Sequence, residues 1–366
     1  SHAKHRTHMA KKICILAFIT ILFSLSSPWI APATASLPNG NRLKDPYAIL
    51  RNSLPIDQKE LRELQNKLED TSEDLRGSRW SAISKATSRS QFLVSNRKNQ
   101  IIDSIPEENK EKATNILSNL KEDLDELGQI ANEKDKVSFV DVRRKSLKKI
   151  DDLESLLITN KFPYEIPSEY DNLPRLLGRA NVEIKTSKGN MNAIIDGYNA
   201  PLTAGAFIDL SLKGFYDGLP INRAEEFFIL QTGDPKGEEI GYVDPENNEL
   251  RKIPLEIRTP NSKDTLYGQT FEEVGLYTET PILPFATLGT LGWAHSDSDL
   301  NDGSSQFFFF LYEAELNPAG RNLIDGRNAA FGYVIEGSEI LNKLGVDDKI
   351  ISIKVLNGSE NLKLKA

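Results

Sequence analysis

Apolar residues recur every three or four positions through residues 57–159, with lysine, aspartate and glutamate between them. This spacing places the apolar side chains on one face of a helix. It predicts four amphipathic helices, at about 57–77, 78–104, 113–131 and 136–159. Because packing of the apolar face supplies most of the stability of such helices, we expect them to bury these faces together in an antiparallel bundle.

Residues that begin and end helices support these boundaries. Asp57 is expected to cap the first helix and Gly77 to close it, while Pro106 marks the end of the second. A short helix is also expected to begin at Asp45-Pro46, before the bundle. Histidines and glycine-rich loops are missing from this part of the sequence, so the leucine stripes are interpreted as core.

After residue 181 the helical spacing ends, and short apolar runs alternate with turn residues. Helices are expected at 200–213 and 338–344. The short runs predict strands at 182–186, 190–195, 221–223, 228–232, 285–288, 306–311, 329–335 and 350–356. Many short strands with two helices predict a closed eight-stranded β-barrel, which leaves no exposed sheet edge.

The predicted chain therefore has two domains, an all-α helical bundle at 36–160 followed by a β-barrel domain at 182–366. Its 366 residues also exceed the usual size of a single domain. Between the two domains, the segment 161–181 contains Pro163 and Pro167, which favour an extended linker.

The first 35 residues have the features of an export signal, preceded by an extension at 1–8. Within 9–35, two lysines precede a short apolar run, and Ala33-Thr34-Ala35 follows it. This order is typical of a Sec-type signal peptide that is cleaved after Ala35. The apolar run is shorter than the roughly 20 residues that span a bilayer. The mature chain is therefore expected to be exported and not to span a membrane.

Composition excludes several kinds of site. The formal net charge of −8 and the pI near 5.3 argue against a nucleic-acid partner, which requires a basic face. Cys14 is the only cysteine and would leave with the signal peptide, so the mature chain has no disulfide or cysteine-based zinc site. Three of the four histidines lie in the first eight residues. We therefore expect neither a metal nor a cofactor.

A candidate binding surface lies between residues 215 and 235. After a turn at Asp217-Gly218, two short apolar runs place Arg223 and Gln231 on either side of Phe228. Two polar groups beside an apolar surface suit a ligand that is apolar in its middle and carries backbone carbonyls at its edge. The alternative is a pair of ordinary strands with a surface arginine.

Two later stretches favour the binding surface. Residues 303–310 have the sequence GSSQFFFF, and residues 325–337 have the sequence DGRNAAFGYVIEG. With residues 215–235 they resemble, in the same order, three sequence blocks of the cyclophilin family. The resemblance implies an eight-stranded cyclophilin-like β-barrel with two helices, and peptidyl-prolyl cis-trans isomerase activity.

The same resemblance implies which residues form the site. Arg223 and Gln231 correspond to catalytic positions, and the substrate-binding positions are Phe228, Ile229, Ala294, His295, Gln306, Phe308, Leu323 and Asn328. Prolyl isomerisation needs no nucleophile or metal, because its barrier is the amide resonance of roughly 18–20 kcal/mol. An apolar pocket for proline and a donor that favours the twisted amide are sufficient.

Several positions depart from the family pattern. Asn222 replaces the histidine before the arginine, and Glu226-Phe227 replaces a Pro-Gly turn. Leu323 and Asn328 replace a tryptophan and a histidine, and Glu225 and Glu226 could pair with Arg223 and occupy the guanidinium. Two functions are therefore open: a prolyl isomerase with a weakened site, and a non-catalytic cyclophilin-fold binding module or assembly chaperone.

An exported barrel that follows an acidic helical bundle resembles the large thylakoid-lumen cyclophilins of cyanobacteria and chloroplasts. The resemblance implies a location in the thylakoid lumen or periplasm and a role in folding or assembly of photosynthetic membrane proteins. The expected partners are proline-containing segments of client proteins, among them lumenal parts of photosystem II subunits.

Overall fold

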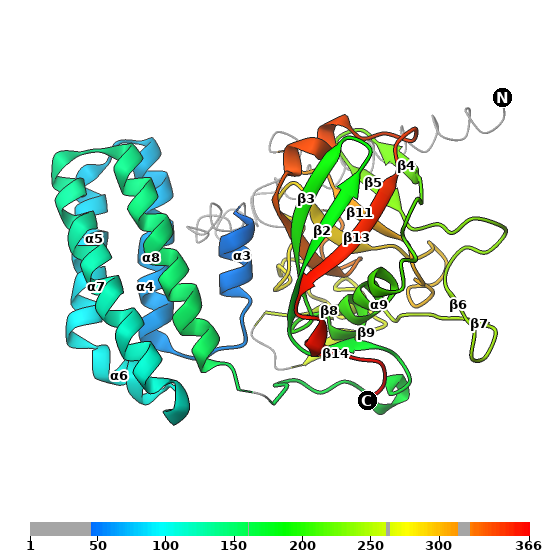
Figure 1. The fold of residues 1–366 in the computed structure, drawn as a ribbon, viewed down its shortest axis with the longest axis horizontal. Helices are drawn as coiled ribbons and strands as arrows, with labels where there is room; N and C mark the ends of the chain where they lie inside the picture. Colours follow the sequence, from blue (N-terminus) through cyan, green and yellow to red (C-terminus); the bar gives the residue numbers. More distant parts are fainter. Residues whose placement is uncertain (1–44, 160, 261–263, 314–322) are drawn as a thin grey trace. The chain divides into compact units, whose positions relative to one another are not determined.

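The structure is a computed structural model that describes residues 45–159, 161–260, 264–313 and 323–366 (Figure 1). It divides into a helical unit from Leu50 to Phe162 and a β unit that contains Pro163 to Ala366. The expected extension, the signal peptide and Cys14 lie outside the described residues. Among the described helices, none combines the length and apolar character needed to cross a membrane.

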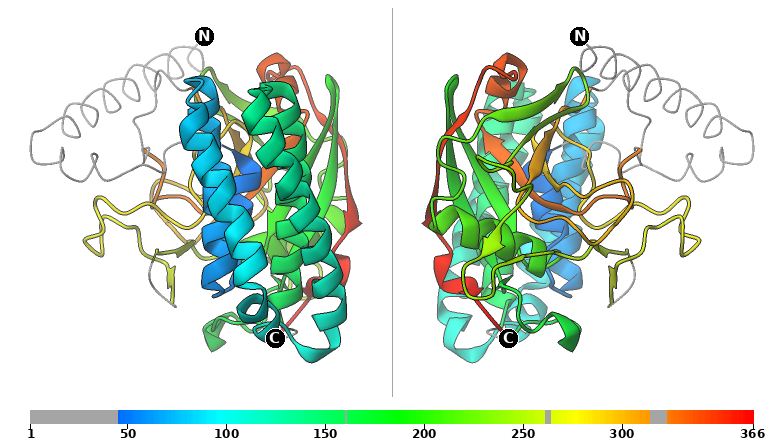
Figure 2. Two further views of the ribbon diagram at one scale, coloured as in Figure 1. Left: turned by 90° about the vertical axis from the view of Figure 1, so that its left-hand side faces the viewer. Right: turned by 90° about the vertical axis from the view of Figure 1, so that its right-hand side faces the viewer.

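The helical unit is a bundle of long helices joined by short turns. Its helices are α4 Lys59–Arg76, α5 Trp80–Asn96, α6 Lys98–Asp103, η2 Glu107–Asn109, α7 Lys110–Glu133 and α8 Lys136–Leu157. The short helix α3 Pro46–Asn52 crosses the start of the unit at Leu50. The long helices α4, α5, α7 and α8 lie side by side with nearly parallel axes (Figure 2). Leu64, Leu120, Leu124 and Ile150 from the predicted stripes are completely buried. The predicted bundle is confirmed.

Two details of the helical unit differ from the prediction. Gln58 caps α4 in place of Asp57, because the Gln58 side chain accepts a hydrogen bond from the backbone N–H of Leu61 at 2.7 Å. The single helix expected over 78–104 is divided at Arg97 into α5 and α6. Just before this break, the Asn96 side chain donates to the carbonyl of Phe92 at 3.3 Å, a local bond that competes with helix continuation.

The β unit is built on one eight-stranded antiparallel sheet with the strand order β13-β2-β3-β12-β10-β11-β5-β4. The strands of this sheet are β2 Arg179–Thr186, β3 Gly189–Asp196, β4 Ile221–Glu225, β5 Ile229–Thr232, β10 Thr290–Trp293, β11 Phe307–Phe310, β12 Ala330–Glu336 and β13 Ile350–Asn357. The backbone N–H of Ile350 donates to the carbonyl of Leu219 at 2.8 Å, and Gly218 donates to Ile350 at 2.8 Å. These bonds join the two ends of the strand order, so the predicted cyclophilin-like barrel is confirmed.

Short elements complete the β unit. They are η3 Ser168–Tyr170, β1 Arg175–Leu176, α9 Pro201–Leu212, β6 Val243–Asp244, β7 Glu249–Leu250, β8 Glu256–Arg258, β9 Thr265–Tyr267, η4 Ser338–Lys343, η5 Ser359–Asn361 and β14 Leu362–Lys363. The predicted helix at 200–213 is confirmed as α9, which lies beside β13 and β14 (Figure 1). The second predicted helix, at 338–344, is present as the 3₁₀ helix η4.

Three strand predictions also need correction. The strand expected at 285–288 is a loop, and β10, which follows this loop, was not predicted. The N–H of Thr290 donates to the carbonyl of Thr287 at 3.2 Å, and Gly289 has a φ of +89°, so a turn occupies this stretch. β2 begins at Arg179, before the expected residue 182. The segment 235–279, where no strand was predicted, holds two small strand pairs, β6 with β7 and β8 with β9.

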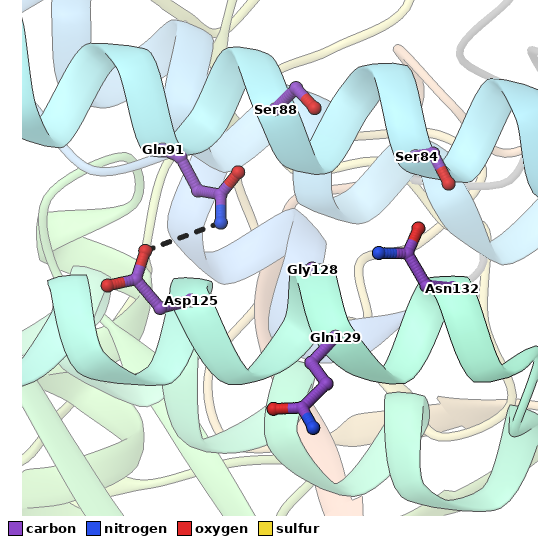
Figure 3. Close-up of a pocket in the computed structure, with 7 residues that line it drawn as sticks. All are labelled: Ser84, Ser88, Gln91, Asp125, Gly128, Gln129 and Asn132. Carbon is purple, nitrogen blue, oxygen red and sulfur yellow. Dashed lines mark hydrogen bonds between the residues drawn. The ribbon is translucent and has the colours of Figure 1, made fainter.

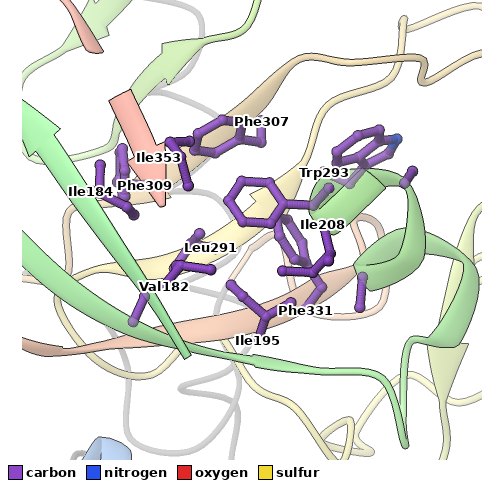
Figure 4. Packing of buried hydrophobic residues seen from close by; sticks show 14 of the residues in the cluster. Val182, Ile184, Ile195, Ile208, Leu291, Trp293, Phe307, Phe309, Phe331 and Ile353 are labelled. Carbon is purple, nitrogen blue, oxygen red and sulfur yellow. The ribbon is translucent and has the colours of Figure 1, made fainter. Parts of the chain in front are cut away.

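The interior of the barrel is filled with aromatic and branched side chains. Phe307, Phe309 and Phe331 are completely buried and pack with Leu291 in the core (Figure 4). Because side chains alternate along a strand, Phe308 on β11 must point to the opposite face of the sheet from Phe307 and Phe309. The core therefore determines which residues of β11 face outward, toward the candidate site.

Candidate active site

Four residues from four neighbouring strands form one row on the outer face of the barrel. Gly292 on β10 is the register partner of Phe308 on β11, Phe308 is the partner of Gln231 on β5, and Gln231 is the partner of Arg223 on β4. Register partners in an antiparallel sheet share a face. The structure thus brings together the two predicted catalytic residues and one predicted pocket residue.

An aromatic cluster lies along this row. Phe308 stacks on Phe285 with the ring centroids 5.7 Å apart and the planes at 15°, and Phe310 meets the edge of Phe285 at 5.8 Å. A Cβ at Gly292 would lie 2.3 Å from the Phe308 ring, so the close approach of this ring over β10 requires glycine. Phe228 packs edge-on against Phe310 at 6.5 Å. Neither Phe285 nor Phe310 was among the predicted site residues: Phe285 was assigned to a strand at 285–288, and the family resemblance named only Gln306 and Phe308 in the strand at 306–311.

The predicted pocket residues differ in their exposure. Phe308 is 4% exposed and Ile229 is 3% exposed, so both lie beneath the surface as a buried apolar floor. Phe228 is half-buried at the end of the β4–β5 hairpin. A proline ring would therefore contact the edges of this floor, with Phe228 as the more accessible member.

A chain of side-chain amides borders the aromatic cluster. Gln231 donates from Nε2 to Oε1 of Gln306 at 2.8 Å, and Asn222 donates to the same oxygen at 3.2 Å. Gln306 donates in turn from Nε2 to the carbonyl of Ile240 at 3.0 Å. The backbone N–H of Ala294 donates to the carbonyl of Gln306 at 3.0 Å. Because both the oxygen and the nitrogen of the Gln306 side-chain amide are hydrogen-bonded, Gln306 holds Gln231 in place. Gln231 is then the amide of this chain that can contact a substrate.

Arg223 is paired with a carboxylate on its own strand. Its Nε and Nη2 donate to Oε1 of Glu225 at 3.0 Å and 2.7 Å. The Arg223 side chain is 46% exposed, whereas that of Glu225 is only 10% exposed. Residues two apart on a strand share a face, so Glu225 holds the guanidinium along β4. Of the two carboxylates expected from the sequence as partners of Arg223, Glu225 is the one that forms the ion pair.

One residue in the turn of the β4–β5 hairpin has an unusual backbone conformation. Phe227 has a φ of +62°, a left-handed conformation that costs a residue with a Cβ roughly 1–2 kcal/mol. The N–H of Phe228 donates to the carbonyl of Glu225 at 3.0 Å and closes this turn. The Phe227 ring is 55% exposed beside the site. A phenyl group thus stands where the family turn has glycine.

The remaining predicted residues join two loops beside β10. Nε2 of His295 lies 2.9 Å from the carbonyl oxygen of Arg327, and Nδ1 lies 2.8 Å from that of Ser296. Asn328 donates to the carbonyl of Trp293 at 3.2 Å. Leu323 is half-buried in the turn at 323–327. His295 and Asn328 therefore contact backbone groups and support the loops, and their expected substrate contacts stay predictions.

A separate pocket of about 330 Å³ lies in the helical unit (Figure 3). It is lined by small and polar residues of α5 and α7, which are Ser84, Ser88, Gln91, Asp125, Gly128, Gln129 and Asn132. Gln91 donates to Oδ1 of Asp125 at 3.3 Å across it. The pocket has no apolar floor that would suit a proline ring. Across the described residues, His, Cys, Asp and Glu side chains form no group of three or more placed to hold a metal ion.

The fold and the aromatic row agree with known proteins. A model of cyclophilin type peptidyl-prolyl cis-trans isomerases matches residues 181–355. A relative from Synechocystis sp., named as a thylakoid lumen peptidyl-prolyl cis-trans isomerase, is 41% identical over 366 residues that cover 97% of this chain and 96% of the relative. The chain belongs to the cyclophilin family. Within this cyclophilin, residues 45–158 match a model described as a CYP38-like, PsbQ-like domain.

Two relatives from Arabidopsis thaliana extend the similarity over both units of this cyclophilin. Chloroplastic CYP38 is 37% identical and covers 91% of the chain and 78% of its own length. Chloroplastic CYP37 is 30% identical and covers 96% of the chain and 79% of its own length. Both are named as peptidyl-prolyl cis-trans isomerases. The combination of a helical unit with a cyclophilin barrel is therefore shared with these relatives.

Proposed function

We propose that this cyclophilin is a peptidyl-prolyl cis-trans isomerase whose activity is weakened by the pairing of its own arginine. The observation that carries the proposal is the row of Arg223, Gln231 and Phe308 on one face of the barrel. It places a cationic donor, an amide and an apolar floor side by side. An X–Pro segment could contact all three groups at once: the floor with its proline ring, the amide with its flanking backbone, and the cationic donor with its prolyl amide.

In the proposed reaction the proline ring packs on the apolar floor made by Phe308 and Ile229. Gln231 contacts the flanking backbone, and Arg223 donates toward the prolyl amide as it twists. Twisting removes the resonance that makes the barrier roughly 18–20 kcal/mol. A donor that interacts more strongly with the twisted amide than with the planar one accelerates the exchange. No covalent bond is made or broken.

The weakening follows from competition for the Arg223 guanidinium. Glu225 accepts two hydrogen bonds from it, at 3.0 Å and 2.7 Å. Hydrogen bonds that involve charged groups contribute about 1.5–3 kcal/mol each, although the partial exposure of Arg223 reduces the net value of the pair. A substrate amide, which is neutral, must displace or share this carboxylate. The rate is therefore expected to lie below that of a site with an unpaired arginine.

Replacing Glu225 with glutamine is expected to raise kcat/KM for an X–Pro peptide by about threefold to tenfold, because the neutral amide binds the guanidinium more weakly. The rate is measured on the mature full-length chain by exchange NMR, which needs no coupling protease. Glu226→Gln is the matched control, since it removes the same charge from the adjacent, exposed position. A rate that is unchanged or lower in Glu225→Gln, with the fold intact by circular dichroism, would contradict the proposed competition.

The same ion pair favours a second candidate function, a non-catalytic binding module or assembly chaperone. With Arg223 engaged by Glu225, the floor and Gln231 can still hold a proline-containing segment without turning it over. The two functions differ in one measurement. A binding module binds an X–Pro peptide in calorimetry and leaves its exchange rate at the uncatalysed value, whereas the isomerase accelerates it.

We further propose that this cyclophilin acts in the thylakoid lumen or the periplasm, after export by a Sec-type signal. The names of the Synechocystis and Arabidopsis relatives support the lumen. The proposed clients are proline-containing segments of photosynthetic membrane proteins, including lumenal parts of photosystem II subunits. The match of residues 45–158 to a PsbQ-like domain supports this choice. Copurification of such subunits with the tagged mature chain from thylakoids would test it.

Cyclosporin-type inhibitors are expected to bind poorly. Leu323 stands where the family has a tryptophan, so the indole N–H donor and its large flat surface are missing. Loss of such a hydrogen bond alone costs about 1 kcal/mol or more, and we expect Leu323→Trp to tighten binding at least fivefold in calorimetry. Tight binding by the unmodified chain would show that another residue fills this position.

A further inference from the structure

Three segments border the Arg223 row: one is hydrogen-bonded to it directly, and two are hydrogen-bonded to Gln306, which binds Gln231 of the row. The β4–β5 hairpin is joined through Glu225, which binds Arg223. The loop at 234–242 is joined through the Ile240 carbonyl, which accepts from Gln306 at 3.0 Å. The loop that follows β10 is joined through the N–H of Ala294, which donates to the carbonyl of Gln306 at 3.0 Å. These hydrogen bonds identify the three segments that border the candidate site.

These segments are strongly acidic. We define the acidic rim as their carboxylates, Glu225, Glu226, Asp234, Glu238, Glu239, Asp297, Asp299 and Asp302. Against these eight carboxylates the same segments hold two cationic side chains, Arg223 and Lys236. The whole chain has 53 acidic and 45 basic residues, so the imbalance at the site is not a property of the overall composition.

The one cation at the centre of the site does not offset the rim. The Arg223 guanidinium donates two hydrogen bonds to Glu225, whose side chain is 10% exposed. Glu226, Glu238, Glu239, Asp297 and Asp299 are all exposed. The electric fields of several negative carboxylates around a partly apolar surface add together, and they attract positively charged ligands.

The loop after β10 is internally braced. Asp302 accepts from the backbone N–H of Ser296 at 2.8 Å and from the Ser296 hydroxyl. Asp299 accepts from the N–H of Asn301 at 2.8 Å. These bonds set the path of the loop through residues 296–302 and keep its carboxylates beside the end of β10. The hydrogen bonds within this loop therefore keep its carboxylates at this side of the site.

We propose that the candidate site selects proline-containing segments that carry lysine or arginine within a few residues of the proline. This inference rests on the proposed function and names its substrate class. A basic flank meets the acidic rim on either side, whereas an acidic flank meets charges of its own sign. The rim therefore determines which client segments are used, and the row of Arg223, Gln231 and Phe308 acts on the proline.

The test compares three peptides with the same central Ala-Pro and with lysine, glutamine or glutamate flanks. Binding is measured by calorimetry and exchange by NMR on the mature full-length chain. At low salt we expect the lysine peptide to bind at least tenfold more tightly than the glutamate peptide. At 0.5 M NaCl, where the Debye length falls to about 4 Å, we expect the ratio to drop to roughly twofold.

A pair of variants locates the effect. Glu238→Gln/Glu239→Gln removes two rim charges and is expected to reduce the lysine-to-glutamate ratio at low salt by about threefold. Glu339→Gln/Glu360→Gln removes two charges from η4 and η5, which pack on β3 and on β2 and β13, in the other part of the strand order. This control is expected to leave the ratio unchanged.

The outcomes separate this inference from the proposed function. Equal binding of all three peptides, or an equal loss of preference in both variants, would overturn the selection of basic flanks and leave the prolyl site intact. Failure to bind any of the three peptides would overturn the proposed function and the inference together. A preference for the glutamate peptide would contradict the role of the acidic rim directly.

Discussion

Replacing Arg223 with alanine is expected to lower kcat/KM for an X–Pro peptide by about 10²-fold. The reason is that Arg223 is the cationic donor in the row with Gln231 and Phe308. Removal of a single donor that is preorganised toward a transition state typically costs 10²–10³-fold. The change should appear mainly in kcat, because the apolar floor that binds proline is untouched. Exchange NMR on the mature full-length chain, with peptide concentration varied, measures both parameters.

Two control variants test whether the effect is specific to the Arg223 guanidinium. Arg223→Lys keeps the charge and loses the planar fork of donors, so it should recover only part of the rate. Arg144→Ala removes an exposed arginine, paired with Asp141 in the helical unit at 3.1 Å, and should leave the rate unchanged. An Arg223→Ala variant that isomerises as fast as the unmodified chain would show that the proposed electrostatic role is wrong.

The stability of the helical unit is expected to fall as the pH rises from about 5 to 8, through the titration of Glu154. This residue of α8 is completely buried, and burial raises the pKa of its carboxyl to about 8, against a smaller opposing effect of Arg62. Nη1 of Arg62 donates to Oε2 of Glu154 at 3.2 Å. Because the folded pKa lies above the unfolded value of 4.5, the fold favours the protonated carboxyl.

The sign of the effect follows from proton binding. Below pH 4.5 the carboxyl is protonated in both states, and its contribution to stability is fully present. Between 4.5 and about 8 only the folded state retains the proton, so each pH unit removes up to about 1.4 kcal/mol from the free energy of unfolding. Urea unfolding at several pH values, followed by the helical circular dichroism signal, measures this slope.

Glu154→Gln is expected to abolish most of this slope, because glutamine does not titrate. Glu126→Gln on the exposed surface of α7 is the matched control and should retain it. A slope that persists in Glu154→Gln would assign the pH dependence to other groups of the same buried cluster. That cluster includes Arg51, Glu69 and Asp151, with Glu69 bound to Arg51 at 2.9 Å.

The sequence alone determined the elements whose pattern is local. The leucine spacing on α7 gave its helix and its buried face, because the 3.6-residue period depends only on neighbours along the chain. The strands β2 and β3 were likewise predicted from a local pattern, the alternation of residues along a strand. α9 was also predicted as a helix, but it is buried on all sides and has no single buried face. The candidate site residues came from motif resemblance, since each block is contiguous in sequence. Local reasoning was wrong at 285–288, where Gly289 places a turn.

Only the tertiary structure decided how these pieces meet. The hairpin of β4 and β5 sets Arg223 beside Gln231, and the pairing of β5 with β11 sets Phe308 beside Gln231. The register of β5 and β11, which lie far apart in the sequence, depends on contacts that no local pattern contains. The stacking of Phe285 on Phe308 and the bond from Gln306 to the carbonyl of Ile240 also depend on the tertiary structure, because Phe285 and Ile240 lie in loops far from β11 in the sequence. Burial of Glu154 likewise depends on the packing of α8 in the bundle. A charged side chain on a helix costs free energy only when neighbouring helices exclude water from it.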